Sequence, residues 1–114
     1  MILKNGDKYI GELDDGKYAG YGVLTYSPTD RRQRILYQGD FRAGKRHGYG
    51  TFRWKSGAVY TGSYVDDERV GFGSLIFGSD DPPKRKSYEG QWENSVMTGL
   101  GTLVYQVRPV LHEL

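Results

Sequence analysis

The sequence predicts an all-β protein built from four copies of one hairpin unit. The first observation is glycine spacing, because fourteen of the seventeen glycines fall on one repeating template. The second is a large ring at the same place in every copy, 17 residues after the tyrosine that begins it. The third is composition: 14% aromatic but only 37% hydrophobic residues suit a thin sheet better than a thick core. A fixed period of this kind decides the architecture before any local pattern is interpreted.

Four tyrosines begin the units, and the template is written as offsets from them. Glycine or a substitute follows at +2, +7, +11 and +13, and an aromatic residue stands at +17. The positions that carry the repeat, unit by unit, are Tyr9, Gly11, Gly20, Gly22 and Tyr26; Tyr37, Gly39, Phe41, Gly48, Gly50 and Trp54; Tyr60, Gly62, Tyr64, Gly71, Gly73 and Phe77; and Tyr88, Gly90, Trp92, Gly99, Gly101 and Tyr105.

Each unit is expected to form two short strands around a turn, which gives about eight main strands. The first strands are predicted over residues 9–13, 37–41, 60–64 and 88–92, and the second over 20–26, 48–54, 71–77 and 99–105. Side chains alternate between the two faces of a strand. Offsets 0, +2 and +4 therefore share one face, as do +11, +13, +15 and +17. This face, called the ring face below, interleaves glycines with large rings and leucines.

Glycine weakens a strand unless the missing side chain has a use. The repetition indicates one: a ring on one strand lies across the bare backbone of a neighbouring glycine and buries a large area there. Gly50 and Gly73 are expected to lie beneath such rings, with no room for a side chain. Gly78, which is off the template, is expected to tolerate alanine.

The hairpin turns are centred near +7. Gly16 and Gly44 suit a backbone with positive φ at this place. Asp67 and Ser95 stand there in the third and fourth units, and such residues adopt positive φ less readily. We therefore expect the third and fourth hairpin tips to differ in shape from the first two.

The unit starts are 28, 23 and 28 residues apart. This spacing assigns a partial repeat or cap to residues 1–8, repeats to 9–36, 37–59, 60–87 and 88–105, and a C-terminal tail to 106–114. The first and third repeats end in ten-residue connectors, and the second ends in one of five residues. The incomplete opening unit indicates a cap or an array taken from a longer one. The tail is expected to cover the edge of the last strand or to begin a longer segment.

Composition places the chain among small intracellular domains. It has 114 residues, no cysteine and no Asn-x-Ser/Thr sequon, which favours a cytoplasmic location. Nothing in it resembles a signal peptide or a membrane span. The net charge of +2 is uneven: residues 1–57 hold 11 Lys/Arg against 6 Asp/Glu, and residues 58–114 hold 5 against 8. A linear array turns this difference into a charge gradient along its length.

Catalysis and metal binding find little support. His47 and His112 are the two histidines, and His47 lies in a predicted hairpin tip. The paired acidic residues fall in turns or a connector, where turn chemistry explains them. No carboxylate pair has a partner at a metal-ligand spacing. Gly-x-Gly recurs, but never as the Gly-x-Gly-x-x-Gly that precedes a helix in dinucleotide sites. We therefore expect no catalytic residue, no metal and no cofactor.

Residues 37–54 (YQGDFRAGKRHGYGTFRW) resemble the MORN repeat, the membrane occupation and recognition nexus. Four in-register copies extend the resemblance over residues 9–105, with departures at Leu13, Asp67, Ser95 and in the two long connectors. The resemblance implies a single-layer, elongated antiparallel sheet of sequential β-hairpins, curved into a groove. MORN arrays are adaptors in cytoskeletal, ciliary and membrane-contact proteins, or accessory segments beside catalytic domains.

The face opposite the rings is the candidate partner-binding groove. Large apolar residues repeat there at +12, and an exposed apolar surface of this kind typically marks a binding site. The residues predicted to meet a peptide or a helix are Tyr21, Tyr49, Phe72 and Leu100, with Glu12, Asp40 and Arg53 beside them. Simple aromatic stabilisation of the strands explains the same pattern and stays open.

The two long connectors carry basic clusters that form a candidate acidic-lipid contact. These are Arg31, Arg32 and Arg34 in the first connector, and Lys84, Arg85 and Lys86 in the third. Basic residues near an anionic membrane contribute about 1 kcal/mol each. A flexible, solvated loop is the plainer explanation. Nucleic acid is not expected, because the clusters are small and the net charge is only +2.

The sequence therefore favours a non-catalytic scaffold or adaptor that binds a protein partner along the sheet groove, in a cytoskeletal or membrane-associated assembly. Two alternatives stay open: a phosphoinositide-binding module that works through the connectors, and an accessory segment of a larger enzyme. Self-association is a further option, because open sheet edges invite pairing.

Overall fold

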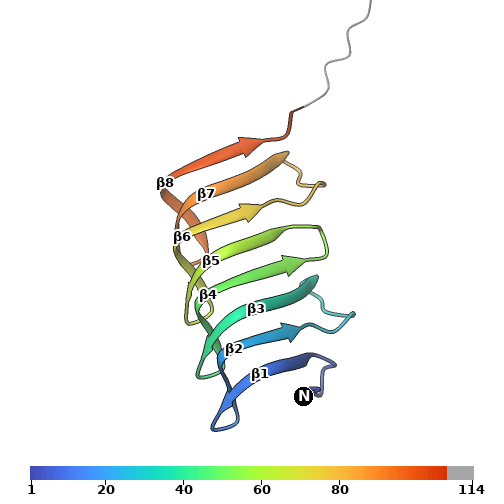
Figure 1. The fold of residues 1–114 in the computed structure, drawn as a ribbon. Helices are drawn as coiled ribbons and strands as arrows, with labels where there is room; N and C mark the ends of the chain where they lie inside the picture. Colours follow the sequence, from blue (N-terminus) through green and yellow to red (C-terminus); the bar gives the residue numbers. More distant parts are fainter. Residues whose placement is uncertain (108–114) are drawn as a thin grey trace, which may run out of the picture.

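A computed structural model describes residues 1–107 and shows one open sheet of eight antiparallel strands. The strands are β1 (Lys8–Asp14), β2 (Lys17–Thr25), β3 (Arg34–Arg42), β4 (Lys45–Trp54), β5 (Val59–Val65), β6 (Glu68–Ile76), β7 (Arg85–Glu93) and β8 (Val96–Tyr105). They lie side by side in sequence order, with no crossover (Figure 1). No helix occurs in the part described, and the all-β hairpin array is confirmed. The tail prediction over 106–114 falls mostly outside the described residues.

The sheet is a single elongated layer. Figure 1 shows the four hairpin tips along one long edge and the connectors between units along the other. The Cα radius of gyration is 16.6 Å, above the about 13 Å of a compact domain of this length. The thinnest dimension is 18 Å, so within residues 1–107 no second layer covers either face. Burial must therefore come from side chains lying flat on their own sheet.

The four hairpin tips share one conformation, and the expectation that two of them differ was wrong. Each turn has two residues between the strands, and both have positive φ in all four. The second turn residues have φ of 76° at Gly16, 83° at Gly44, 71° at Asp67 and 64° at Ser95. This is the turn geometry that the right-handed twist of paired strands favours. The strand geometry thus overrides the preference of aspartate and serine for negative φ.

The second strand of each hairpin begins three residues earlier than the sequence predicts. β2, β4, β6 and β8 all start at +8, and the predicted start at +11 is a bulge instead. In the first hairpin, Gly11 pairs with Gly22 but Glu12 pairs with Ala19, so Gly20 and Tyr21 are the inserted residues. Gly20 has a φ of 56°, and a side chain there would collide with the Glu12 carboxylate. The glycines at +11 therefore serve the bulge and are not part of the ring face.

The ring face is built as predicted, with each unit's tyrosine lying over a pair of facing glycines. Tyr37 is fully buried, and a side chain added at Gly50 would fall within its ring. Its hydroxyl donates to the carbonyl of Asp40 at 2.8 Å, and the other three units repeat this bond. The phenol thus covers glycine backbone and satisfies a carbonyl at the bulge.

Edge-to-face rings join the units into one continuous core along the sheet. Tyr37 meets Phe41 at 4.9 Å and Tyr64, in the next unit, at 5.4 Å between ring centroids. Tyr60 meets Tyr64 and Trp92 at 5.3 Å each. Aromatic pairs prefer this geometry and gain about 0.5–1.5 kcal/mol beyond area burial. Each unit therefore stabilises its neighbours through these ring contacts, which an isolated hairpin would lack.

The expectation that Gly78 tolerates alanine was also wrong. A Cβ at this position would lie 2.7 Å from the backbone oxygen of Ser56. Gly78 begins the third connector, which passes against the connector of the second unit, and that contact is invisible in the repeat pattern.

Candidate binding surfaces

The four apolar residues of the predicted groove lie on the face opposite the rings, and this surface is called the anchor face below. The exposed fractions are 51% for Tyr21, 59% for Tyr49, 58% for Phe72 and 87% for Leu100. Tyr49 and Arg53 alternate along β4 with Gly50 and Phe52 of the ring face, which fixes their direction. The structure thus brings one large apolar side chain per unit to the same exposed surface.

Polar partners of the anchors lie directly across the strands. Tyr21 pairs with Asp40, Tyr49 with Ser63 and Phe72 with Gln91 in the registers between units. Directly opposed residues share a face. The Asp40 carboxylate accepts the backbone N–H of Tyr49 at 3.0 Å, so it is already engaged in the bulge. Glu12 occupies the corresponding place in β1 and is exposed.

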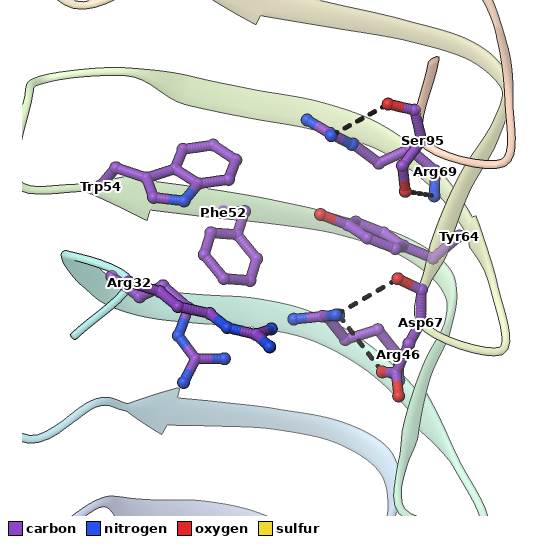
Figure 2. Close-up of a pocket in the computed structure, with 9 residues that line it drawn as sticks. Arg32, Arg46, Phe52, Trp54, Tyr64, Asp67, Arg69 and Ser95 are labelled. Carbon is purple, nitrogen blue, oxygen red and sulfur yellow. Dashed lines mark hydrogen bonds and ion pairs between the residues drawn. The ribbon is translucent and has the colours of Figure 1, made fainter. Parts of the chain in front are cut away.

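A pocket of about 170 Å³ lies on the ring face, at the centre of the array. Sequence reasoning did not predict it. Its walls are three aromatic rings from β4 and β5, four arginines, one carboxylate and one hydroxyl: Phe52, Trp54, Tyr64, Arg32, Arg34, Arg46, Arg69, Asp67 and Ser95. Figure 2 shows Tyr64 between the guanidinium groups of Arg46 and Arg69.

Arg46 is held by the turn of the next hairpin. Its backbone N–H donates to Asp67 Oδ1 at 2.9 Å, and its Nη2 donates to the Asp67 carbonyl at 3.2 Å. Its Nε lies 3.3 Å from Asp67 Oδ1 but is not aimed at it and makes no hydrogen bond with a described residue. The guanidinium also lies 5.0 Å from the Phe52 ring centroid and 5.4 Å from that of Tyr64. Arg46 is therefore an ion-paired cation set among rings.

Arg69 repeats the position of Arg46 one unit later, but without the carboxylate. Ser95 stands where Asp67 stands, and its Oγ accepts the Arg69 backbone N–H at 3.1 Å. The Arg69 Nη2 donates to the Ser95 carbonyl at 3.1 Å, and no described carboxylate lies within ion-pair distance. Burial lowers the pKa of this guanidinium from its usual value. The guanidinium lies 4.8 Å from the Trp92 ring centroid, and the Glu68 carboxylate accepts from Ser95 Oγ at 2.6 Å. Arg69 is thus a half-buried cation among rings, without an ion pair to a described residue.

The signal for these arginines was present in the sequence. Both stand at +9, the same parity as the ring-face positions +13, +15 and +17, and Tyr18 and Met97 take this place in the outer units. Because the second strand was expected to begin only at +11, position +9 was assigned to a turn. Two central arginines flanked by apolar residues indicate a cationic middle on an aromatic face.

The basic connectors are more ordered and less free than expected. Arg34 makes two hydrogen bonds to the Asp30 carboxylate, of 3.0 and 2.7 Å, and Arg85 makes the same pair with Asp81, of 3.0 and 2.8 Å. Each guanidinium also lies over a ring, Arg34 over Tyr26 and Arg85 over Phe77. Two of the six cations therefore stabilise the connectors, and the four that remain are Arg31, Arg32, Lys84 and Lys86.

Little in residues 1–107 suggests catalysis. His47 lies in β4 and is partly buried; its Nδ1 accepts the Asp66 backbone N–H at 3.4 Å and lies 3.6 Å from Asp66 Oδ1. No group of three or more His, Asp and Glu side chains in this part of the chain could hold a metal ion. Over the same residues, no helix has the length and apolar character to cross a membrane.

Comparisons with known proteins agree with the repeat pattern. The family described as MORN repeat matches residues 9–31, 37–59, 60–81 and 88–107. Mouse alsin is 31% identical over 109 residues, which are 91% of this chain and 6% of alsin. MORN repeat-containing protein 3 of Xenopus laevis is 30% identical over 91% of this chain and 33% of its own. ALS2 C-terminal-like protein of cattle is 33% identical over 78% of this chain and 9% of its own. The chain thus spans a third or less of the length of these relatives.

Proposed function

The chain belongs to the MORN repeat family, and from that premise we propose that it is a non-catalytic binding module that holds a protein partner along its sheet. Its relatives carry such arrays as parts of larger proteins, which supports the role of a module. The pocket hydroxyl, Ser95 Oγ, donates to the Glu68 carboxylate at 2.6 Å and also accepts the Arg69 backbone N–H, which holds it in the turn. A binding role therefore suits these side chains best.

The observation that carries the proposal is the exposure of the four anchors. Folding alone does not require Tyr21, Tyr49, Phe72 and Leu100 to be more than half exposed on one face. Anchors of successive units are separated by two strand spacings, about 9.6 Å. Seven residues of a helix rise about 10.5 Å, and three residues of an extended chain span about 10 Å. A helix with an apolar residue in every seventh place, or an extended segment with one in every third, would meet one anchor per unit.

The experiment is a paired substitution at the centre of the anchor face. Tyr49→Ser with Phe72→Ser should reduce the capture of bound protein by about tenfold or more, since each truncation removes an exposed aromatic anchor. The matched control is Val65→Ser with Val96→Ser, which removes two exposed apolar side chains at hairpin tips. Capture from extract is quantified by mass spectrometry, and thermal melting verifies that both variants stay folded. Equal capture by the anchor variant and the wild type would overturn this placement of the partner.

The phosphoinositide alternative is weaker in the structure than in the sequence. Arg34 and Arg85 are committed to Asp30 and Asp81, so the connectors offer fewer cations than a count of basic residues indicates. The third connector adds no large apolar group suited to a bilayer, and the first adds one, Ile35, which is 39% exposed. We therefore keep protein binding as the principal proposal.

A further inference from the structure

We propose that the ring-face pocket between Arg46 and Arg69 receives an aspartate or glutamate side chain from an acidic segment of the protein partner. The inference rests on the proposed function only in assuming that a protein partner exists. It adds a site on the face opposite the anchors and assigns the chemistry that the site recognises.

The equivalent position beside Arg46, one unit earlier, is occupied by a side-chain carboxylate. In the second unit the guanidinium of Arg46 lies beside the carboxylate of Asp67, with Nε 3.3 Å from Oδ1. The backbone register that brings them together repeats one unit later, since Asp67 N–H donates to the Arg46 carbonyl and Ser95 N–H to the Arg69 carbonyl. The third and fourth units therefore place the Ser95 turn around Arg69 as the Asp67 turn lies around Arg46, and this arrangement of turn and arginine is called the cradle below.

Among the described residues, no carboxylate lies within ion-pair distance of the Arg69 guanidinium. Ser95 Oγ accepts the backbone N–H that Asp67 accepts in the preceding unit, and it donates to the Glu68 carboxylate at 2.6 Å. Glu68 thus lies beside Ser95, but it makes no ion pair with the Arg69 guanidinium. A guanidinium has five N–H donors, and that of Arg69 gives one hydrogen bond to a described residue, at the Ser95 carbonyl. Its other N–H groups make no hydrogen bond with a described residue, and Arg69 forms part of the pocket wall. A carboxylate from outside would supply what Ser95 does not.

The surroundings favour an anion carried on a carbon stem. Arg46, Arg32 and Arg34 line the same pocket as Arg69, and Asp67 is its one carboxylate. The rings of Phe52, Trp54 and Tyr64 complete the walls and offer apolar contact to methylene groups. Charge-assisted hydrogen bonds between arginine and carboxylate are strong and are frequently bidentate. The equivalent position beside Arg46 holds the carboxylate of Asp67. For this reason we assign the site to an acidic peptide, and the test below distinguishes that peptide from a phosphate ligand.

The test titrates the full chain with an acetylated and amidated tetraglutamate peptide, with the tetraglutamine peptide as its uncharged counterpart. Binding is followed through the side-chain N–H resonances of Arg46, Arg69 and Trp54 in heteronuclear NMR spectra. The expected result is a saturable shift at Arg69 and Trp54 with tetraglutamate and none with tetraglutamine. Inorganic phosphate at equal ionic strength is the third probe. Tighter binding of phosphate than of tetraglutamate would overturn the assignment to a carboxylate.

Three variants with the same change in net charge locate the site. Arg69→Gln and Ser95→Asp should each weaken tetraglutamate binding by about tenfold or more, since one removes the donor and the other fills the cradle with an internal carboxylate. Arg31→Gln lies in an exposed connector outside the pocket and should leave the affinity within about twofold. Ser95→Asp keeps the test valid if Arg69→Gln folds poorly, because Asp67 already adopts the same positive φ. Equal affinity in Ser95→Asp and the wild type would refute the proposal.

The anchor-face variant separates this inference from the proposed function. Tyr49→Ser with Phe72→Ser should bind tetraglutamate as the wild type does, because the pocket lies on the other face. Loss of partner capture with intact peptide binding supports both proposals. If the wild type captures its partner but neither it nor any variant binds tetraglutamate, the pocket proposal is refuted and the proposed function is not.

Discussion

At the scale of the residue, one tyrosine per unit replaces the second layer that a sheet normally needs. Tyr9, Tyr37, Tyr60 and Tyr88 lie flat on their own sheet, all at most 6% exposed. Each can do so because the two glycines beneath it have no side chain. The hydroxyl then satisfies a carbonyl at the bulge, so burying the phenol leaves no unpaired oxygen.

Gly50→Val tests this packing. A side chain at Gly50 would overlap the ring of Tyr37, which is fully buried and has no room to move away. We expect a loss of about 1–3 kcal/mol in the free energy of unfolding, or more if the ring is expelled. Chemical denaturation measures it.

Gly16→Asn is the control for Gly50→Val. Position 16 has open space around it, and asparagine tolerates its φ of 76° better than other residues. Its melting temperature should fall much less than that of Gly50→Val. Equal shifts in the two variants would contradict the ring-over-glycine packing.

At the scale of the element, the connectors are stabilised by one device used twice, 51 residues apart. Asp30 and Asp81 each accept the backbone N–H of the arginine four residues later and both arms of its guanidinium. Each connector then gives a backbone carbonyl to the following unit, at Gln33 and Lys84. The array therefore alternates a long, ion-paired connector with a short one, and its structural period is two MORN units.

The connectors should make stability depend on pH in the acid range. Hydrogen bonds from Arg34 and Arg85 hold the pKa values of Asp30 and Asp81 below their usual range. A carboxylate whose pKa is lower in the folded than in the unfolded chain stabilises the protein when the pH is above its unfolded-state pKa, about 3.9. That stabilisation is lost as the pH falls through the folded-state pKa. Asp30→Asn with Asp81→Asn should thus lower the melting temperature at pH 7.

The difference from the wild type should shrink well below pH 4, when the wild-type carboxylates are protonated as well. Differential scanning fluorimetry over a pH series measures both limits. Asp80→Asn removes an exposed carboxylate that makes no ion pair with a described residue, and it should change little at any pH. A constant difference between double variant and wild type across the series would contradict the ion-pair account.

At the scale of the whole molecule, the core is a ladder of phenols, and this makes the array sensitive to alkali. Burial raises the pKa of Tyr60 to about 12 and also raises the pKa values of Tyr26, Tyr37 and Tyr64. A tyrosine whose pKa is higher in the folded than in the unfolded chain stabilises the protein fully when the pH is below its unfolded-state pKa, about 10. That stabilisation is lost as the pH rises through the folded-state pKa.

We therefore expect the melting temperature to fall steeply between about pH 10 and pH 12, as tyrosinate absorbance rises together with loss of the β signal in circular dichroism. Tyr60→Phe removes one of these ionisations and should flatten part of the alkaline fall, although it loses the hydrogen bond to the Ser63 carbonyl at neutral pH. Tyrosine ionisation that is complete before any loss of β signal would argue against phenols as the core.

The sequence by itself determined the repeat, the strand order and the ring-over-glycine face. Tyr37 and Gly50 are found from spacing alone, because strand alternation and a fixed period leave few places where a ring and a bare backbone can meet. The exposed anchors Tyr21, Tyr49, Phe72 and Leu100 follow from the same alternation. Local rules sufficed because every contact of this kind lies within one unit or between neighbouring strands.

Only the tertiary structure decided the tips and the pocket. Ser95 and Asp67 accept positive φ because the twist of paired strands imposes one turn geometry, against their local preference. Arg46 meets Asp67, and Arg69 meets Ser95, across 21 and 26 residues. The register between units brings these residues together in both cases, and the aspartate or serine at the turn then decides whether an ion pair forms. That register follows from the bulges and connectors, and the spacing of the repeat does not encode it.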